Sequence, residues 1–289
     1  QRALGGLKVA FKRRGSATVL DRLRQSGCLK VRSPRVEPDE WTTAVVLNTS
    51  GGITAGDRLE STFVLGPGAQ ASITSQAAER FYRALPNEAP AQVRARVRIE
   101  NGAAAEWLPQ ETILFDGCAM DRRLEVELEE DADFLGLEML VFGRAAMGET
   151  VRRARARDVI RVRRNGALVL HDAVRLDENL EAILQQRVTA GGARAMATLI
   201  MCGNDRAKAQ GEAVACETLT RCFASAPRSL PGGRLSSAIE RGVEAAASTW
   251  NGITVARILA PDGATLRGVV ASALDVLRAP RGLPRVWYC

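Results

Sequence analysis

Hydrophobic and polar residues alternate along much of the first two-thirds of the chain, as they do in strands with one buried face. The segment 93–100 is the clearest case, with Val and Ile set against Arg and Glu, and 124–128 repeats the pattern among glutamates. Asn101-Gly102 and Asn165-Gly166 adjoin such segments and are typical two-residue hairpin turns. The pattern therefore predicts an all-β body built from antiparallel strands.

The last third of the chain changes character. Residues 198–201 and 253–259 predict strands, whereas 207–224 and 262–277 carry apolar residues at helical spacing and predict two α-helices. No internal repeat and no low-complexity linker divides the sequence. We expect one β-rich domain over residues 1–289, with both helices near the C-terminal end.

A glycine-rich stretch, Asn48 to Asp57, stands between the apolar run 44–47 and the alternating segment 59–65. Gly51, Gly52 and Gly56 permit backbone conformations that side chains disfavour, so a strand, a tight turn and a second strand are expected. The stretch lacks the lysine of a phosphate-binding loop and opens no helix, which argues against a nucleotide site. A structural turn and a functional site that fixes the Asp57 carboxylate both remain open.

Composition is that of a globular protein, with 289 residues of which 46% are hydrophobic and 25% charged. Forty Lys and Arg against 33 Asp and Glu give a net charge of +7, but the arginines are spread along the predicted strands. A solvated basic surface explains this better than nucleic-acid binding, for which no aromatic platform is evident. Six scattered cysteines form no zinc or disulfide pattern, and no stretch is apolar enough to span a membrane, so a cytoplasmic protein is expected.

Candidate chemistry is sparse because the chain has one histidine, His171. Five carboxylates stand beside segments expected to be buried: Asp57, Glu79, Asp116, Glu138 and Asp172. Buried carboxylates are costly unless they are paired, hydrated or metal-bound. They could pair with nearby arginines such as Arg58, Arg80, Arg144 and Arg175, or line a polar passage that briefly holds a divalent cation. An enzyme with His171 and Asp57 or Asp172 as general base is the alternative.

Several segments in order carry a resemblance to one family. Asn48 to Asp57 resembles the Asn-x-x-Gly-Gly-x-x-x-Gly-Asp signature of the urease accessory proteins UreD, with Asn48, Gly51, Gly52 and Gly56 as its framework. Segments 73–83, 106–116 and 142–149 are similar to further family motifs, and 255–259 and 284–287 fit its closing pattern. Thr49-Ser50 departs from the Pro-Pro common in the signature, which should alter the rigidity of the turn.

The resemblance implies a non-enzymatic protein of stacked, superhelical β-sheets with two helices. Such a protein assembles with UreF directly, and with UreG through UreF, on apo-urease, and assists nickel delivery. It implies no tightly bound cofactor and no stable metal site, only nickel in transit through an internal passage. Asp57, Thr74, Ser75, Glu138 and Asp172 are the residues expected along that passage. The two predicted helices are the candidates for the surface that faces UreF.

Overall fold

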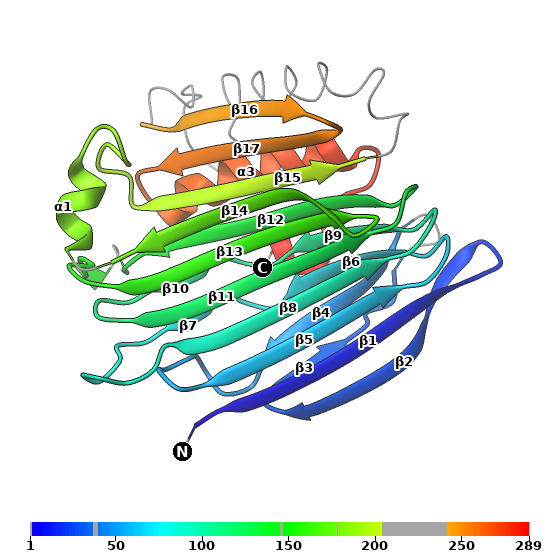
Figure 1. Cartoon of the computed structure of the whole chain (residues 1–289), viewed down its shortest axis with the longest axis horizontal. Helices are drawn as coiled ribbons and strands as arrows, with labels where there is room; N and C mark the ends of the chain where they lie inside the picture. Colours follow the sequence, from blue (N-terminus) through cyan, green and yellow to red (C-terminus); the bar gives the residue numbers. More distant parts are fainter. Residues whose placement is uncertain (1, 37–39, 145–146, 178, 204–241, 289) are drawn as a thin grey trace.

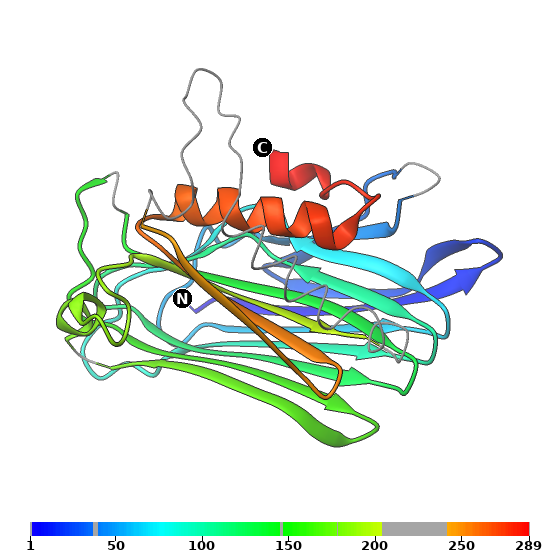
Figure 2. The same ribbon diagram turned by 90° about the horizontal axis from the view of Figure 1, so that it is seen from above.

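Two β-sheets lie face to face, and a helix covers the outer face of one of them (Figures 1 and 2). The computed structural model describes residues 2–36, 40–144, 147–177, 179–203 and 242–288. Within these residues the strands form one seven-stranded and one ten-stranded sheet.

The seven-stranded sheet has the order β14-β13-β11-β8-β5-β1-β2. Its strands are β1 (Leu4–Arg14), β2 (Ala17–Gly27), β5 (Arg58–Leu65), β8 (Ala91–Ile99), β11 (Ala119–Leu128), β13 (Arg155–Arg164) and β14 (Ala167–Leu176).

The ten-stranded sheet has the order β16-β17-β15-β12-β9-β6-β4-β3, with β10 and β7 attached beside β12. Its strands are β3 (Leu29–Arg32), β4 (Thr42–Asn48), β6 (Gln70–Ser75), β7 (Glu79–Phe81), β9 (Ala104–Leu108), β10 (Thr112–Leu114), β12 (Asp133–Phe142), β15 (Ala195–Cys202), β16 (Glu244–Trp250) and β17 (Ile253–Ala260).

The chain winds back and forth between the two sheets from β4 to β13. Apart from the short strands β7 and β10, which follow β6 and β9 in the same sheet, successive strands fall in opposite sheets. Neighbours within one sheet run parallel, as in β5–β8–β11–β13 and β4–β6–β9–β12. This arrangement confirms the stacked, superhelical β architecture. It also shows that antiparallel pairing was the wrong expectation for the middle of the chain, because Asn101-Gly102 links β8 to β9 in the other sheet rather than closing a hairpin.

Antiparallel pairing is confined to the beginning and end of the winding. The predicted hairpin at Asn165-Gly166 joins β13 and β14, and both turn residues have positive φ. The strands β12, β15, β17 and β16 also pair antiparallel, as do β1 with β2 and β3 with β4. The strands expected near 198–201 and 253–259 are thereby confirmed as β15 and β17.

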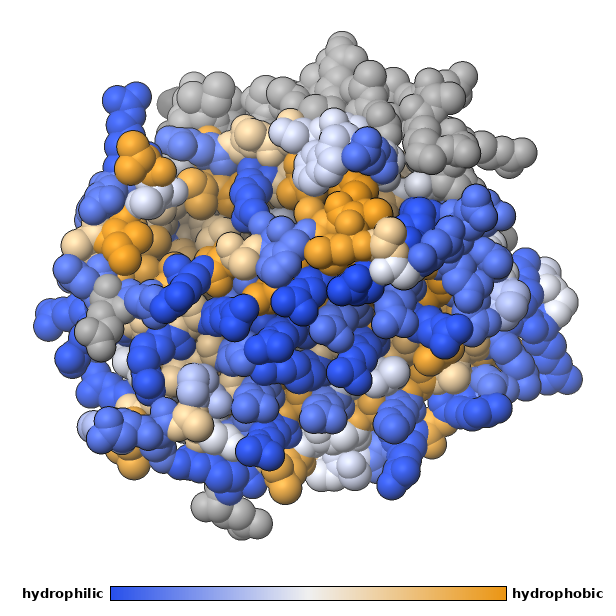
Figure 3. Space-filling model, viewed as in Figure 1, coloured by the Kyte–Doolittle hydropathy of each residue, from blue (hydrophilic) through white to orange (hydrophobic). Residues whose placement is uncertain are grey.

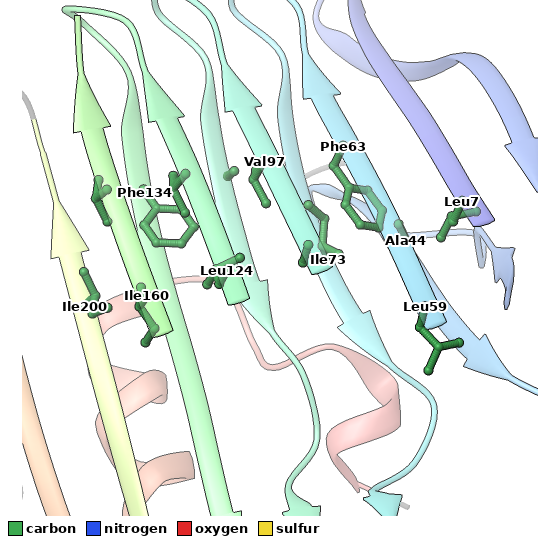
Figure 4. Close-up of a cluster of buried hydrophobic side chains, with 14 of the residues drawn as sticks. Leu7, Ala44, Leu59, Phe63, Ile73, Val97, Leu124, Phe134, Ile160 and Ile200 are labelled. Atoms are coloured by element: carbon green, nitrogen blue, oxygen red, sulfur yellow. The ribbon is translucent and has the colours of Figure 1, made fainter. Parts of the chain in front are cut away.

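Two apolar cores follow from this layering. The larger lies between the sheets, where Phe63 and Val97 of one sheet meet Ile73 and Phe134 of the other (Figure 4). The smaller lies between the ten-stranded sheet and helix α3 (Gly263–Arg278), where Leu266, Val270 and Leu274 pack. Odd residues of β12 and β15 face this second core, and even residues face the inter-sheet core.

Helix α3 confirms the helix predicted at 262–277. The Asp262 side chain accepts a hydrogen bond from the Thr265 backbone at 2.7 Å and caps it. The other predicted helix, 207–224, lies outside the described residues. A short helix that the periodicity did not indicate, α1 (Leu180–Gln185), follows β14, and a 3₁₀ turn, Arg285–Tyr288, follows α3.

Hydrophilic side chains dominate the face seen in Figure 3, and apolar atoms gather toward its upper part, where Figure 1 shows β14 near β15 and β17. The strand arginines pair with carboxylates of the next strands: Arg94 with Asp121 at 2.6 Å and Arg96 with Glu125 at 3.1 Å. These pairs are typical of a solvated charged surface. Across the parts of the chain that the structure describes, no helix is long and apolar enough to cross a membrane.

Candidate functional site

The glycine-rich stretch forms a turn at one end of the two sheets. Ile53 forms a bridge with Phe81, and the Tyr82 hydroxyl donates to the Gly51 carbonyl at 3.0 Å. Gly52 has φ 150°, and a Cβ at this position would lie 2.3 Å from Cε2 of Tyr82. The glycine is therefore required by the close approach of the tyrosine ring, a reason that concerns packing rather than phosphate.

Asn48 connects this turn to a carboxylate. Its Oδ1 accepts hydrogen bonds from the Ser50 backbone at 3.0 Å and the Ser50 hydroxyl at 2.6 Å, while Nδ2 donates to Glu79 Oε2 at 3.0 Å. The Thr49 hydroxyl donates to the Cys28 carbonyl at 3.0 Å. The two hydroxyl residues thus hold the turn by side-chain hydrogen bonds where the family signature commonly has prolines.

Asp57 is buried at 2% exposure behind the turn. Its two carboxylate oxygens accept hydrogen bonds from the backbone N–H groups of Ala3, at 2.7 Å, and Thr54, at 2.8 Å. It does not line the cavity described next. In this structure its carboxylate fastens the start of β1 to the turn.

A cavity of about 180 Å³ lies between the sheets beside the turn. Three of the candidate residues, Thr74, Ser75 and Glu138, line it, and Asn48, Gly51 and Gly52 contribute at the turn. Other polar residues from both sheets and the loops beside them contribute side-chain or backbone atoms to its lining: Ser61, Gln76, Glu79, Arg80, Arg94, Gln110, Thr112, Arg122 and Arg123. The signature turn and three of the five predicted passage residues therefore line one hollow.

A buried charge cluster occupies the inner wall of this cavity. Arg122 of β11 reaches across to the ten-stranded sheet, where its Nη1 lies 2.7 Å from Glu138 Oε2. The same guanidinium donates to both oxygens of Asp158, at 2.9 and 2.5 Å, and to the Thr112 hydroxyl at 2.7 Å. All four side chains are buried, and Trp107 donates to the second oxygen of Glu138 at 2.9 Å.

Burial dominates the electrostatics of the two carboxylates in the cavity. Desolvation and, to a lesser extent, nearby Asp158 raise the pKa of Glu138 to about 7, against the opposing effects of Arg122 and Trp107. Desolvation likewise raises the pKa of Glu79, although Asn48 and the arginines Arg80 and Arg122 favour its charged form. The cavity therefore holds carboxylates whose charge is sensitive to their partners.

A second, smaller hollow lies on the far side of Glu138. Glu138 lines it together with Asp158, Asp172 and Thr198. Glu138 and Thr198 are direct neighbours across β12 and β15, and Arg257 of β17 donates to Thr198 at 3.3 Å and also pairs with Asp172. Polar groups thus continue from Ser75, past Glu138, to Asp172. The Thr74 hydroxyl lies on the other face of β6, where it donates to the Leu108 carbonyl at 2.7 Å, and Asp57 stands apart.

The remaining carboxylate, Asp116, is paired with an arginine as one of the two interpretations expected, although not with one of the arginines suggested. Asp116 pairs with Arg83 at 3.0 Å and accepts from the backbone of Arg152 and Arg153, which lower its pKa together with Arg83. Within the described ranges, no three His, Cys, Asp or Glu side chains are grouped so as to hold a metal ion. Any cation bound at Glu138 would therefore be held by few oxygen ligands.

The histidine alternative gains no geometric support. His171 is exposed on β14, the edge strand of the seven-stranded sheet, and Asp172 points to the opposite face because side chains alternate along a strand. Asp57 precedes β5, which is four strands away from β14, or at least about 19 Å at the usual strand spacing. Neither carboxylate is placed to act with this imidazole.

Sequence reasoning missed Arg122 and Asp158, the residues that neutralise Glu138. They are direct cross-strand neighbours in the parallel pair of β11 and β13. Their identities were visible in the segments 119–128 and 155–164, but their pairing follows only once those two strands are known to be parallel neighbours.

Fold and site together define a superhelical β protein built around a buried, ion-paired polar cavity. The family model described as UreD urease accessory protein matches residues 3–288. The chain is 37% identical to a urease accessory protein UreD of Rhizobium etli, with 99% of this chain and 96% of that protein covered. It is 41% identical to those of Dinoroseobacter shibae and Methylobacterium sp., with 99% of this chain and 92% and 93% of those proteins covered. The chain belongs to the UreD family of urease accessory proteins.

Proposed function

We propose that this protein is a non-enzymatic scaffold that assists nickel insertion into apo-urease and that nickel crosses it through the inter-sheet cavity. UreF is the direct partner, and UreG acts through UreF. Nickel is cargo in transit rather than a resident cofactor.

One observation carries the proposal. The cavity beside the signature turn and the small hollow beyond it share the Glu138 carboxylate, so oxygen-bearing side chains are placed on both sides of one buried point. Hydroxyl and carboxylate oxygens bind divalent cations weakly when few of them are present, which suits a cation that must leave again. Ser75, Glu138 and Asp172 would meet the cation in that order, beside Thr74, whose hydroxyl donates to the Leu108 carbonyl at 2.7 Å.

Asp57 has a supporting part in this proposal. Because both of its oxygens are already bound by backbone N–H groups, it positions the turn rather than ligating nickel. Asn48 acts in the same way by holding Glu79 at the cavity wall.

The test is the nickel content of urease. In a strain that lacks this protein, urease purified at ordinary nickel supply should contain little nickel, and the full chain supplied in trans should restore it. UreF should co-purify with the protein when the two are co-expressed. Fully nickel-loaded urease in the deletion strain would end the proposal.

A matched pair of variants then tests the cavity itself. Glu138→Gln removes the shared carboxylate and should lower the nickel content of urease several-fold while UreF still co-purifies. Glu127→Gln, on the exposed face of β11, should leave the nickel content unchanged. Equal nickel loading with both variants would show that the cavity carries no cargo.

A further inference from the structure

The guanidinium of Arg122 stands where a metal ion would find its ligands. Four oxygens surround it: two from Asp158, one from Glu138 and one from Thr112, at 2.5 to 2.9 Å from its nitrogens. They come from both sheets, and Arg122 and the three residues that supply them are each at most 8% exposed. Hard divalent cations choose this type of ligand, two carboxylates and a hydroxyl, with waters completing the shell.

The cluster can carry more negative than positive charge, so a cation with a higher charge than the guanidinium would match it better. When both carboxylates are ionised, they and the one guanidinium carry a net charge of −1, whereas the same carboxylates around a divalent cation would be neutral. Glu138 Oε2 also accepts no hydrogen bond of good geometry, although it faces Arg122 Nη1. Buried carboxylates gain most from an opposite charge held close to them, and a divalent ion supplies more of it than a guanidinium does.

Arg122 also has a second acceptor within the same cavity. Glu79 lines that cavity beside Arg122 and is held in place by Asn48. Charge interaction between the two side chains already favours the guanidinium, so Glu79 can receive it if it leaves Glu138 and Asp158. A long, flexible side chain needs only new rotamers for such a move, and the cavity supplies the space.

We propose that Arg122 is a displaceable plug: its guanidinium and a divalent cation compete for the oxygens of Glu138, Asp158 and Thr112, and the arginine moves toward Glu79 when the cation enters. This inference rests on the proposed function for the identity of the cation. It adds that the passage is closed at Arg122 until a cation displaces the side chain, which keeps free ions from crossing at low concentration.

The experiment measures the melting temperature of the purified full-length protein with Ni²⁺ alone and with a chelator. Arg122→Met fills similar space without a charge, so it leaves two buried carboxylates unpaired and should lower the melting temperature in chelator. Saturating Ni²⁺ should then raise the melting temperature of the variant by about 5–10 °C, while the wild type should shift by no more than about 1 °C.

Two controls separate the plug from general metal binding. Arg122→Lys keeps a positively charged side chain at this position, so its melting temperature should not rise with Ni²⁺. Arg122→Met combined with Glu138→Gln and Asp158→Asn lacks the proposed carboxylate ligands, so its melting temperature should not rise with Ni²⁺ either. A rise of equal size in the wild type or in this triple variant, or no rise in Arg122→Met, would overturn the inference.

If Arg122→Met does not fold, a second variant still tests whether Arg122 is a displaceable plug. Arg122→Gln can still donate to one carboxylate and serves as the second variant, refolded with Ni²⁺ or with chelator. Recovery of folded protein only with Ni²⁺ supports the plug, and failure under both conditions contradicts it. The melting temperature reports metal binding by the protein itself. If Ni²⁺ stabilises the variant but urease from the deletion strain is fully loaded with nickel, the metal site is retained and only its role in nickel delivery is rejected.

Discussion

The carboxylate of Asp57 joins two stretches of backbone that are 54 residues apart in sequence. Replacing it with alanine leaves the N–H groups of Ala3 and Thr54 without their acceptors in a buried place. Hydrogen bonds to charged groups contribute more than neutral ones, so Asp57→Ala should lower the free energy of unfolding by about 2–3 kcal/mol in urea denaturation. Glu60→Ala, exposed on the adjoining strand β5, is the matched control and should change it by no more than about 0.5 kcal/mol. Equal stabilities would mean that the turn does not depend on this carboxylate.

Glu138 should make the stability of the protein depend on pH. Its folded-state pKa is raised by burial from the ordinary value of 4.5 to about 7, so between these values the folded state holds the proton more firmly than the unfolded chain. The free energy of unfolding should therefore fall as pH rises through this window, by about 1 kcal/mol per pH unit, and the contribution is gone above it. Urea titrations of the wild type and Glu138→Gln at pH 5, 6 and 7 measure the difference in slope (about one proton). Parallel slopes would show that Glu138 is ionised throughout.

Asp57 and Glu138 show how much the sequence alone reveals about single residues. Asp57 and Glu138 stood out because a carboxylate beside apolar residues is expensive to bury, and both are indeed buried. Their partners did not stand out, since Ala3 and Arg122 lie far from them along the chain. A single segment can indicate that a charged side chain is buried, but the residue that pairs with it depends on which strands become neighbours.

At the scale of elements, helix α3 is fastened to the ten-stranded sheet by more than its apolar stripe. Arg278 at its last turn is 1% exposed, and its Nε donates to Glu106 Oε2 of β9 at 3.0 Å. Ser72 of β6 donates to the same oxygen at 2.5 Å, and Arg281 lies 2.7 Å from the other one. The end of the helix is therefore tied to two strands by one buried glutamate.

Breaking this connection should be costly. Arg278→Ala removes one cation from a fully buried cluster and should lower the free energy of unfolding by about 3 kcal/mol, because Glu106 keeps only Arg281 and Ser72 as partners. Val276→Ala, at a residue of the same helix that is 43% exposed, should have a much smaller effect. Urea denaturation followed by circular dichroism compares the two. A cost for Arg278→Ala no larger than that for Val276→Ala would show that the apolar stripe alone holds the helix.

The apolar face of α3 and the ion pair of Arg278 with Glu106 differ in how far the sequence could predict them. Leu266, Val270 and Leu274 recur at helical spacing, and this pattern located α3 to within a residue. Arg278 continues the same face, but an arginine near the end of a helix is usually solvated. Its burial against β9 depends on the sheet order, which periodicity does not contain.

At the scale of the whole molecule, the winding between two sheets explains the main wrong expectation. Alternating residues indicate a strand with one buried face whichever way its neighbour runs. Between β4 and β13 most connections of the chain pass from one sheet to the other. The Asn-Gly turn at 101–102 therefore makes an inter-sheet connection, whereas the one at 165–166 closes a hairpin. The same winding places the inner ends of many strands around one cavity, which no single segment could indicate.

The cavity as a route can be tested by blocking its opening without touching its polar groups. Ala77 lies at the cavity lining yet is exposed, so Ala77→Trp should be tolerated by the fold while its indole covers the entrance. Ala173→Trp, exposed on β14 away from this cavity, presents the same bulk elsewhere. With melting temperatures and UreF co-purification unchanged for both variants, urease matured with Ala77→Trp should contain several-fold less nickel than urease matured with Ala173→Trp. Because the obstruction is steric, excess nickel should restore loading only partly. Full loading by Ala77→Trp at ordinary nickel supply would mean that the ion takes another path, even if the protein remains necessary for maturation.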